Sequence, residues 1–175
     1  GIETKKIVWD NVQIAANDTT TVSFDVTINE KKINPETLLE EDVTNVKNIA
    51  VVGNHDTNEV EDKVVNIKTV KTSVGTHKDG TLATEENPLH ELDKITYTLT
   101  SINYGEGTGS VVITDEIPEG TTLEGKIVDS YGNEYTEQEL KEGIILTLKP
   151  EENKSITFTV TINPFIAMDE TQIVD

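Results

Sequence analysis

The sequence predicts an all-β fold of antiparallel strands packed as a sandwich. Apolar and polar residues alternate along many short segments, most clearly in TTTVSFDVTIN (19–29) and KSITFTVTIN (154–163). Successive side chains of a strand point to opposite faces, so this alternation gives one buried and one solvated face. Turns containing Gly, Asn or Pro separate most of these segments, and such spacing favours a sandwich over a parallel sheet.

The same alternation predicts strands along the whole chain. In the strand expected at 154–163, Ile156, Phe158, Val160 and Ile162 share the inward face. Thr dominates the other face, where a β-branched hydroxyl suits a solvated strand. The expected strands are 5–14, 19–29, 43–53, 63–74, 95–103, 110–118, 123–131, 143–148 and 154–163.

Two short helical crossovers interrupt the strand pattern. Asn34 is a good N-cap and Pro35 suits the first helical position, which predicts a helical turn over 35–42. Thr136, with Glu139 three residues later, has the spacing of a capping box, and Gly143 is a suitable C-terminal residue. The second pattern predicts a helix over 136–142.

An internal repeat divides the chain. NVQIAANDTTTVSFDVTIN (11–29) resembles IILTLKPEENKSITFTVTIN (144–163), and each copy is followed by a Pro-containing stretch, 33–42 and 162–170. Similarity of this kind is typical of tandem arrays. We therefore predict that residues 1–62 are the C-terminal part of a first repeat. Residues 63–175 would then be a second repeat that lacks its last strand, in a chain excised from a longer protein.

Composition excludes several classes of function. The 175 residues include 33 acidic residues against 14 lysines and no arginine, a net charge of −19. This charge is opposite to the basic surface that binds nucleic acid or an anionic membrane. No apolar run approaches the roughly 20 residues of a membrane-spanning helix. The absence of cysteine excludes disulfides, thiol catalysis and cysteine-ligated zinc.

The segment ITYTLTSINYGEGTGSVVITDEIPEGTTL (95–123) resembles a bacterial cell-surface repeat, the domain of unknown function 11. Its Tyr–Thr strand, Asn-x-Gly turn and Thr-Asp-x-x-Pro-x-Gly strand end carry the resemblance. Tyr104 lies inside the turn and Ser101 interrupts the alternation, which are small departures. The Trp9 segment and the Asn48-x-Ala50 strand resemble the end of a preceding copy.

This family is related to the collagen-adhesin B-type and pilin repeats of Gram-positive bacteria. The resemblance implies an immunoglobulin-like sandwich in tandem copies, and a non-enzymatic spacer or stalk role at the extracellular cell wall. Neighbouring repeats would be its partners. Two alternatives are a directly ligand-binding adhesin domain, with loops 75–93 or 104–110 contacting a host protein or glycan, and an accessory β-sandwich of a secreted carbohydrate-active enzyme.

Some relatives carry an isopeptide bond between Lys and Asn, and the resemblance makes Lys71, Asn48 and Asp115 candidates for its lysine, asparagine and acid. The reaction requires a neutral lysine amine and a buried, protonated acid beside the amide. Asn48 should pair with a lysine before residue 1, and Lys71 with an asparagine after residue 175. A bond between them would require the two half-repeats to complement each other. The alternative is a solvated Lys71, an ordinary strand residue Asn48, and an Asp115 that caps the turn before Pro118.

The remaining chemical groups predict no cofactor and no enzymatic activity. His55, His77 and His90 lack metal-binding spacing and are expected at the surface. GEGTG (105–109) is expected to be a hairpin loop, and no Ser has a nucleophile-elbow context. The acidic clusters are expected to be solvated faces, with calcium binding as the alternative. They are Glu40, Glu41 and Asp42, and Glu59, Glu61 and Asp62.

The expected loss of the last strand has a consequence for assembly. A sheet that lacks one strand presents unpaired N–H and C=O groups along an edge, to which another chain can add. We therefore predict dimerisation or strand exchange, with a strand-exchanged dimer as one form.

Overall fold

The computed structural model describes residues 7–165, and these residues form an all-β structure with one short helix. Every strand pairing among them is antiparallel. In chain order the elements are β1 (Lys31–Ile33), β2 (Glu40–Asp42), β3 (Asn45–Asn48), β4 (Val51–Val52), β5 (His55–Asp56), β6 (Val60–Lys63), β7 (Ile67–Thr76), β8 (Lys94–Asn103), β9 (Gly109–Ile113), β10 (Thr121–Asp129), β11 (Glu134–Tyr135), α1 (Glu137–Glu142), β12 (Ile144–Leu148) and β13 (Asn153–Ile162).

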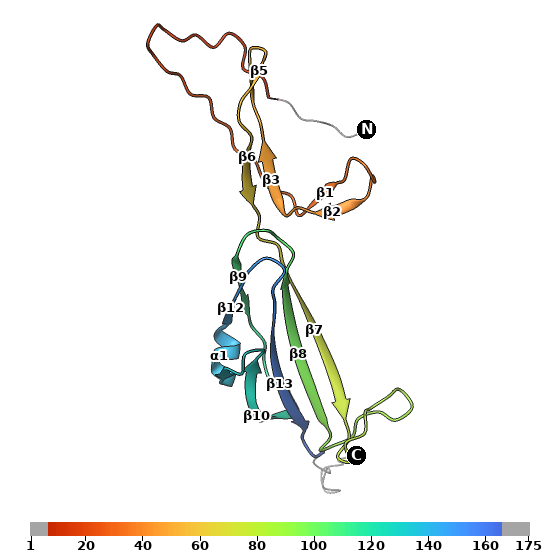
Figure 1. Cartoon of the computed structure of the whole chain (residues 1–175). Coiled ribbons are helices and arrows are strands. Elements are labelled where there is room, and N and C mark those ends of the chain that lie inside the picture. Colours follow the sequence, from red (N-terminus) through yellow and green to blue (C-terminus); the bar gives the residue numbers. More distant parts are fainter. Residues whose placement is uncertain (1–6, 166–175) are drawn as a thin grey trace, which may run out of the picture.

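The strands β7 to β13 form the expected sandwich (Figure 1). One sheet has the order β11-β10-β13-β8-β7, and the other contains β12 and β9. In the larger sheet, β8 pairs along its whole length with β7 and nearly all of it with β13. Three of the four inward positions predicted for β13 are buried, namely Ile156, Phe158 and Val160, whereas Ile162 at the strand end is half-buried.

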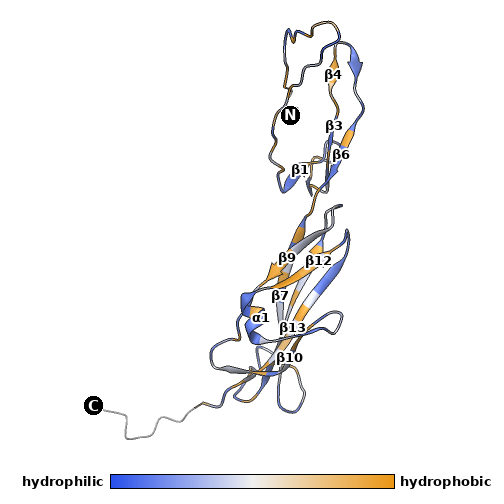
Figure 2. Ribbon diagram, turned by 90° about the vertical axis from the view of Figure 1, so that its left-hand side faces the viewer, coloured by the Kyte–Doolittle hydropathy of each residue, from blue (hydrophilic) through white to orange (hydrophobic). Residues whose placement is uncertain are grey.

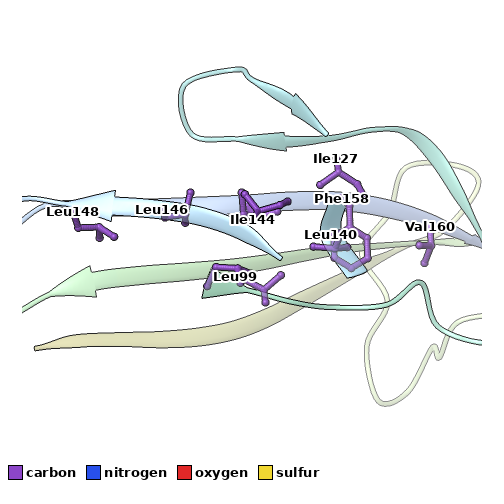
Figure 3. Close-up of a cluster of buried hydrophobic side chains, with 10 residues drawn as sticks. Leu99, Ile127, Leu140, Ile144, Leu146, Leu148, Phe158 and Val160 are labelled. Carbon is purple, nitrogen blue, oxygen red and sulfur yellow. The ribbon is translucent and has the colours of Figure 1, made fainter. Parts of the chain in front are cut away.

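The hydrophobic core lies between these two sheets. Figure 3 shows its side chains converging from both sheets and from α1. A thin core of this kind fits the low aromatic content of the sequence. The buried members are Leu99, Ile113, Ile127, Leu140, Ile144, Leu146, Leu148, Ile156, Phe158 and Val160.

Residues 7–63, here called the arm, extend beyond one end of the sandwich (Figures 1 and 2). The arm contains three two-stranded ladders, β1–β2, β3–β6 and β4–β5. Val43 is the only buried apolar residue among its described residues. Figure 2 shows apolar residues along the arm as well as along the sandwich. The predicted domain division at residue 62 stays a prediction.

The predictions of strands at 5–14 and 19–29 are wrong for their described residues. Residues 7–29 form no strand and are exposed throughout, whereas residues 5 and 6 lie outside the described part of the chain. Alternating apolar residues allow a strand to bury one face, but a strand also needs a neighbouring strand to accept its hydrogen bonds. No described strand pairs with residues 7–29. The predicted strand 43–53 is split into β3 and β4, and 110–118 is a strand only as far as Ile113.

The helix predicted at 35–42 is also absent, although its cap forms. The Asn34 side-chain oxygen accepts hydrogen bonds from the N–H groups of Glu36 (2.9 Å) and Thr37 (3.2 Å). Leu38 then adopts a positive φ of 58°, and the chain returns as β2. The cap therefore closes a hairpin turn between β1 and β2 instead of starting a helix.

The second predicted helix is confirmed as α1. Thr136 Oγ1 accepts a hydrogen bond from the Glu139 N–H (3.2 Å), and Glu139 Oε2 accepts one from the Thr136 N–H (2.8 Å). This reciprocal pair is a capping box. The helix places Leu140 in the core. Within residues 7–165, no helix has the length and hydrophobicity required to cross a membrane.

Candidate functional site

Lys71 and Asp115 meet between the two sheets. Lys71 lies opposite the buried Leu99 in the β7–β8 register, so its side chain starts on the core side of the sheet. Its Nζ lies 2.5 Å from Asp115 Oδ2 and 4.8 Å from the centroid of the Tyr97 ring. A second ring, that of Phe158, lies 5.9 Å from the same nitrogen. The lysine head is therefore held by an acid and two aromatic rings.

The Asp115 carboxylate makes one ion pair and one hydrogen bond. Oδ2 is buried, and the Lys71 ammonium is its partner. Oδ1 accepts only from the neighbouring Glu116 N–H (3.0 Å). The expected Asx-type cap before Pro118 is therefore not formed.

This pair is open on one side. The Lys71 side chain is 40% exposed, because the smaller sheet has only β9 and β12 among the described strands and leaves the inner face of β7 uncovered.

The structure does not bring Asn48 to Lys71 and Asp115. Asn48 lies on β3 in the arm, opposite Val60, and is exposed. Figure 1 shows β3 above the sandwich and β7 within it. The two half-repeats do not complement each other in the described part of the chain, so these residues show no bond between Lys71 and Asn48.

A second polar cluster, here called the junction, connects the arm to the sandwich through residues 42–45, 64–68 and 103–107. Its centre is Asn103, which is fully buried. Asn103 Oδ1 accepts from the N–H groups of Asn66 (3.3 Å) and Gly105 (3.0 Å). Asn103 Nδ2 donates to the carbonyl oxygens of Gly107 (2.8 Å) and Leu148 (3.3 Å). One side chain thus ties together three segments.

Charged and small residues complete the junction. Glu106 Oε1 accepts from Asn45 Nδ2 (2.7 Å) and Thr44 Oγ1 (3.1 Å). Lys68 Nζ contacts both carboxylate oxygens of Asp42 (2.9 and 3.1 Å), and hydrogen bonds from Lys31 and Lys68 lower the Asp42 pKa. A Cβ at Gly105 would lie 2.1 Å from a backbone oxygen of Val64, so only glycine fits there.

The expectation of a hairpin at 105–109 is therefore wrong. This loop carries the chain from β8 in the larger sheet to β9 in the smaller one. The Asn-x-Gly motif was the sequence signal for a special turn here, but nothing in the motif indicates its contacts with the arm.

A third cluster lies in the loop between β7 and β8 and contains His77, His90 and Asp93. Asp93 is buried, and its pKa is lowered to about 2, chiefly because its carboxylate accepts a hydrogen bond from the His90 N–H. The His77 pKa is raised because Nδ1 contacts Asp93 Oδ2 at 2.7 Å. His90 and His55 are exposed as expected, whereas the expectation for His77 is wrong, because its side chain is largely covered.

The turn between β10 and β11 surrounds another buried carboxylate, that of Asp129 at the end of β10. Oδ1 accepts from the N–H groups of Tyr131 (2.8 Å) and Asn133 (2.9 Å). Oδ2 accepts from Asn133 Nδ2 (2.7 Å) and the Tyr135 hydroxyl (3.1 Å). Burial raises the pKa of Asp129, but these hydrogen bonds outweigh burial, and the net pKa lies below its ordinary value.

The acidic clusters considered for calcium contact lysines. Lys31 pairs with Asp42 and Lys32 with Glu41 across β1–β2. Lys47 Nζ lies 3.6 Å from a carboxylate oxygen of both Glu59 and Glu61. These lysines compensate part of the charge that would attract a cation.

Comparisons give no relative for this chain. No protein-family model, no curated protein and no solved structure matches it.

Proposed function

We propose that the chain is a non-enzymatic stalk module of a Gram-positive cell-surface adhesin or pilin-like protein, located at the extracellular cell wall. Its partners would be neighbouring repeats of the same protein. The sequence resemblance supports the location at the cell wall, and the direction of the strands supports the role in bearing tension.

The direction of β7 and β13 is the observation that carries this proposal. Both strands are antiparallel to β8, so they point the same way. The start of β7 and the start of β13 lie at the Asn103 end of β8, because Ile67 pairs with Asn103 and Asn153 with Ile102. The end of β13 lies at the opposite end, where Thr161 pairs with Lys94.

Tension between residues 63 and 165 would therefore load the ladders in shear. Residue 63 leads into β7 at the junction end, and residue 165 follows β13 at the other end (Figure 1). In this geometry the hydrogen bonds on both sides of β8 resist force together. When both strands are pulled from the same end, the bonds break one after another. A stalk that transmits tension benefits from the first arrangement.

Single-molecule force spectroscopy tests this role. The chain contains no cysteine, so introduced cysteines are unique handles. Handles in Lys63→Cys/Phe165→Cys apply shear, whereas handles in Lys63→Cys/Tyr104→Cys pull β7 and β8 apart from one end. We expect a several-fold higher unfolding force for the first pair. Equal forces would contradict the mechanical proposal.

We further propose that Lys71 and Asp115 are the lysine and the acid of an isopeptide crosslink to an asparagine on an added strand. The Lys71 amine would attack the asparagine side-chain carbonyl. A new C–N bond forms, the bond to the amide nitrogen breaks, and ammonia leaves, with Asp115 carrying the proton. The uncovered inner face of β7 and the direct contact between Lys71 Nζ and Asp115 Oδ2 support this assignment.

Mass spectrometry tests the crosslink. A synthetic peptide of residues 43–53, which carries Asn48 in the family position, is incubated with the protein. We expect an adduct about 17 Da lighter than the sum of the two masses. It should be absent with Lys71→Arg, with Asp115→Asn and with an Asn48→Ala peptide, but present with Lys68→Arg. Failure to form any adduct, together with an unmodified mass of the protein alone, would contradict the crosslink.

A further inference from the structure

The buried Asp93 carboxylate is fixed in place by the backbone around it. Oδ2 accepts a hydrogen bond from the His90 N–H (2.8 Å), and Oδ1 accepts one from the Lys78 N–H (3.1 Å). The Asp93 carbonyl oxygen also accepts from the N–H of Ile162 at the end of β13 (2.9 Å). The carboxylate is therefore held rigidly where β7 and β13 end and β8 begins.

Two imidazole rings face this carboxylate. His77 Nδ1 lies 2.7 Å and His90 Nδ1 lies 3.7 Å from the same Asp93 oxygen, Oδ2. One ligand atom from each of the three residues lies within 4.8 Å of the others. Tetrahedral zinc, with bonds of about 2.0–2.2 Å, separates its ligand atoms by about 3.4 Å. To bind zinc, the distance between His77 Nδ1 and Asp93 Oδ2 needs to widen slightly, and the His90 ring needs to move toward them.

Both movements are compatible with the surroundings. The His90 side chain is 67% exposed, so its ring can turn without repacking the core. Asp93 Oδ2 uses one lone pair for the His90 N–H, which leaves the other for a metal in place of the His77 contact. The Lys78 N–H continues to orient the carboxylate through Oδ1.

His77 also lies next to a backbone oxygen that can accept the outer hydrogen bond of a metal-binding histidine. Its Nε2 lies 3.3 Å from the backbone oxygen of Asn87 and 3.0 Å from Asn87 Nδ2. Donation of the Nε2 proton to the Asn87 backbone oxygen, with the side-chain amide turned by 180°, leaves the Nδ1 lone pair directed at the cluster. Metal-ligating histidines almost always donate their other ring N–H in this way.

We propose that His77, His90 and Asp93 bind a divalent transition metal ion, with zinc the best match and water as the fourth ligand. Two imidazoles and one carboxylate suit zinc, whereas calcium requires a set of oxygen ligands. The bound ion would hold the β7–β8 loop closed at the end of the sandwich opposite the junction. The alternative is a hydrogen-bonded His77–Asp93 pair that only stabilises the loop.

Isothermal titration of the untagged protein with ZnCl₂ tests the proposal, with CaCl₂ titrated in parallel. We expect one zinc ion per chain and no comparable calcium binding. His90→Gln should weaken zinc binding at least about tenfold. Removing a residue that only orients a ligand already lowers metal affinity by about 10–100-fold, and removing a ligand itself should cost at least as much. His55→Gln is the matched control, since His55 is an exposed histidine of the arm, and it should bind like the wild type.

Cobalt provides a second measurement. Co²⁺ bound in this site should give the visible absorption of a tetrahedral complex, which His90→Gln should lose. Because the His90 side chain is exposed, this variant should keep the wild-type circular dichroism, so loss of binding is not loss of folding. Absence of one-to-one zinc binding to the wild type, or unchanged binding by His90→Gln, would overturn the proposal.

Discussion

Replacing Phe158 or Phe24 with alanine compares two copies of the internal repeat at the same position. The buried face of β13 carries Ile156, Phe158, Val160 and Ile162, and the arm repeats it as Val22, Phe24, Val26 and Ile28. The turn before each segment is also the same, because Asn17 and Glu151 have φ of 62° and 61°. The repeated sequence and the shared turn would by themselves predict equal effects of the two substitutions.

The structure predicts very different effects. Phe158 is 1% exposed and packs against Tyr97, with ring centroids 5.3 Å apart. Truncating such a buried ring costs about 3–5 kcal/mol. For a unit of roughly 100 residues, each kcal/mol lowers Tm by about 4 °C or more, so Tm should fall by at least about 12 °C. Phe24 is 46% exposed, and its loss should change the free energy of unfolding by less than about 0.5 kcal/mol.

Two spectroscopic signals separate the arm from the sandwich. Trp9 is the only tryptophan, and its ring centroid lies 5.6 Å from that of Phe24. Its fluorescence therefore reports on the arm, whereas far-ultraviolet circular dichroism reports mainly on the sandwich strands. In urea, Phe158→Ala should shift the circular dichroism transition to lower concentration. Phe24→Ala should alter only the tryptophan signal.

A cost of more than about 1.5 kcal/mol for Phe24→Ala would refute this reasoning. Such a cost means that residues 19–29 are packed as β13 is packed, as they would be in a strand-exchanged dimer. The same conclusion would follow if the tryptophan transition coincided with that of the sandwich and depended on protein concentration.

Two further predictions concern buried polar groups. Asn103→Ala removes four hydrogen bonds, two of them long, and should cost about 2–4 kcal/mol in urea unfolding. The exposed Asn58→Ala should cost less than about 0.5 kcal/mol, and equal effects would contradict the role of the junction. Because the pKa of Asp129 is lowered by folding, its stabilisation is fully present above its ordinary pKa and is lost as the pH falls through the folded value. Asp129→Asn should therefore flatten the acid side of the stability–pH curve. An unchanged slope would contradict a contribution of the ionised Asp129 carboxylate to stability.

The sandwich could be predicted because its signals are local. Alternation at β8 and β13 determines which side chains are buried, and the capping box at Thr136 and Glu139 determines where α1 begins. Alternation and capping patterns do not predict structure that depends on pairing with a distant segment. Residues 19–29 alternate as well as β13 does, but a strand forms only where a neighbouring strand accepts its hydrogen bonds. The cap at Asn34 forms too, yet the residues after it return as a hairpin.

The candidate sites differ in the same way. Lys71 and Asp115 were predicted from the family resemblance, and the structure brings them together across the two sheets. Asn48 was predicted with them but lies in the arm. His77 and Asp93 are 16 residues apart, so no metal-binding spacing links them. They meet because β7 ends where β8 begins, which is a consequence of pairing and is not visible in the local sequence.

Two of the polar clusters lie outside the thin core. The core is built from Ile, Leu, Val and Phe and offers no hydrogen-bond partners, and these two clusters lie at the ends of the sandwich. Asn103 and Glu106 occupy the end next to the arm, and His77 and Asp93 occupy the other. On the proposed stalk role, the β7–β8–β13 ladder can resist shear only if the chain at each end remains attached while force is applied. The two clusters supply those attachments, so weakening either one should lower the unfolding force more than an equally destabilising change at the middle of β8.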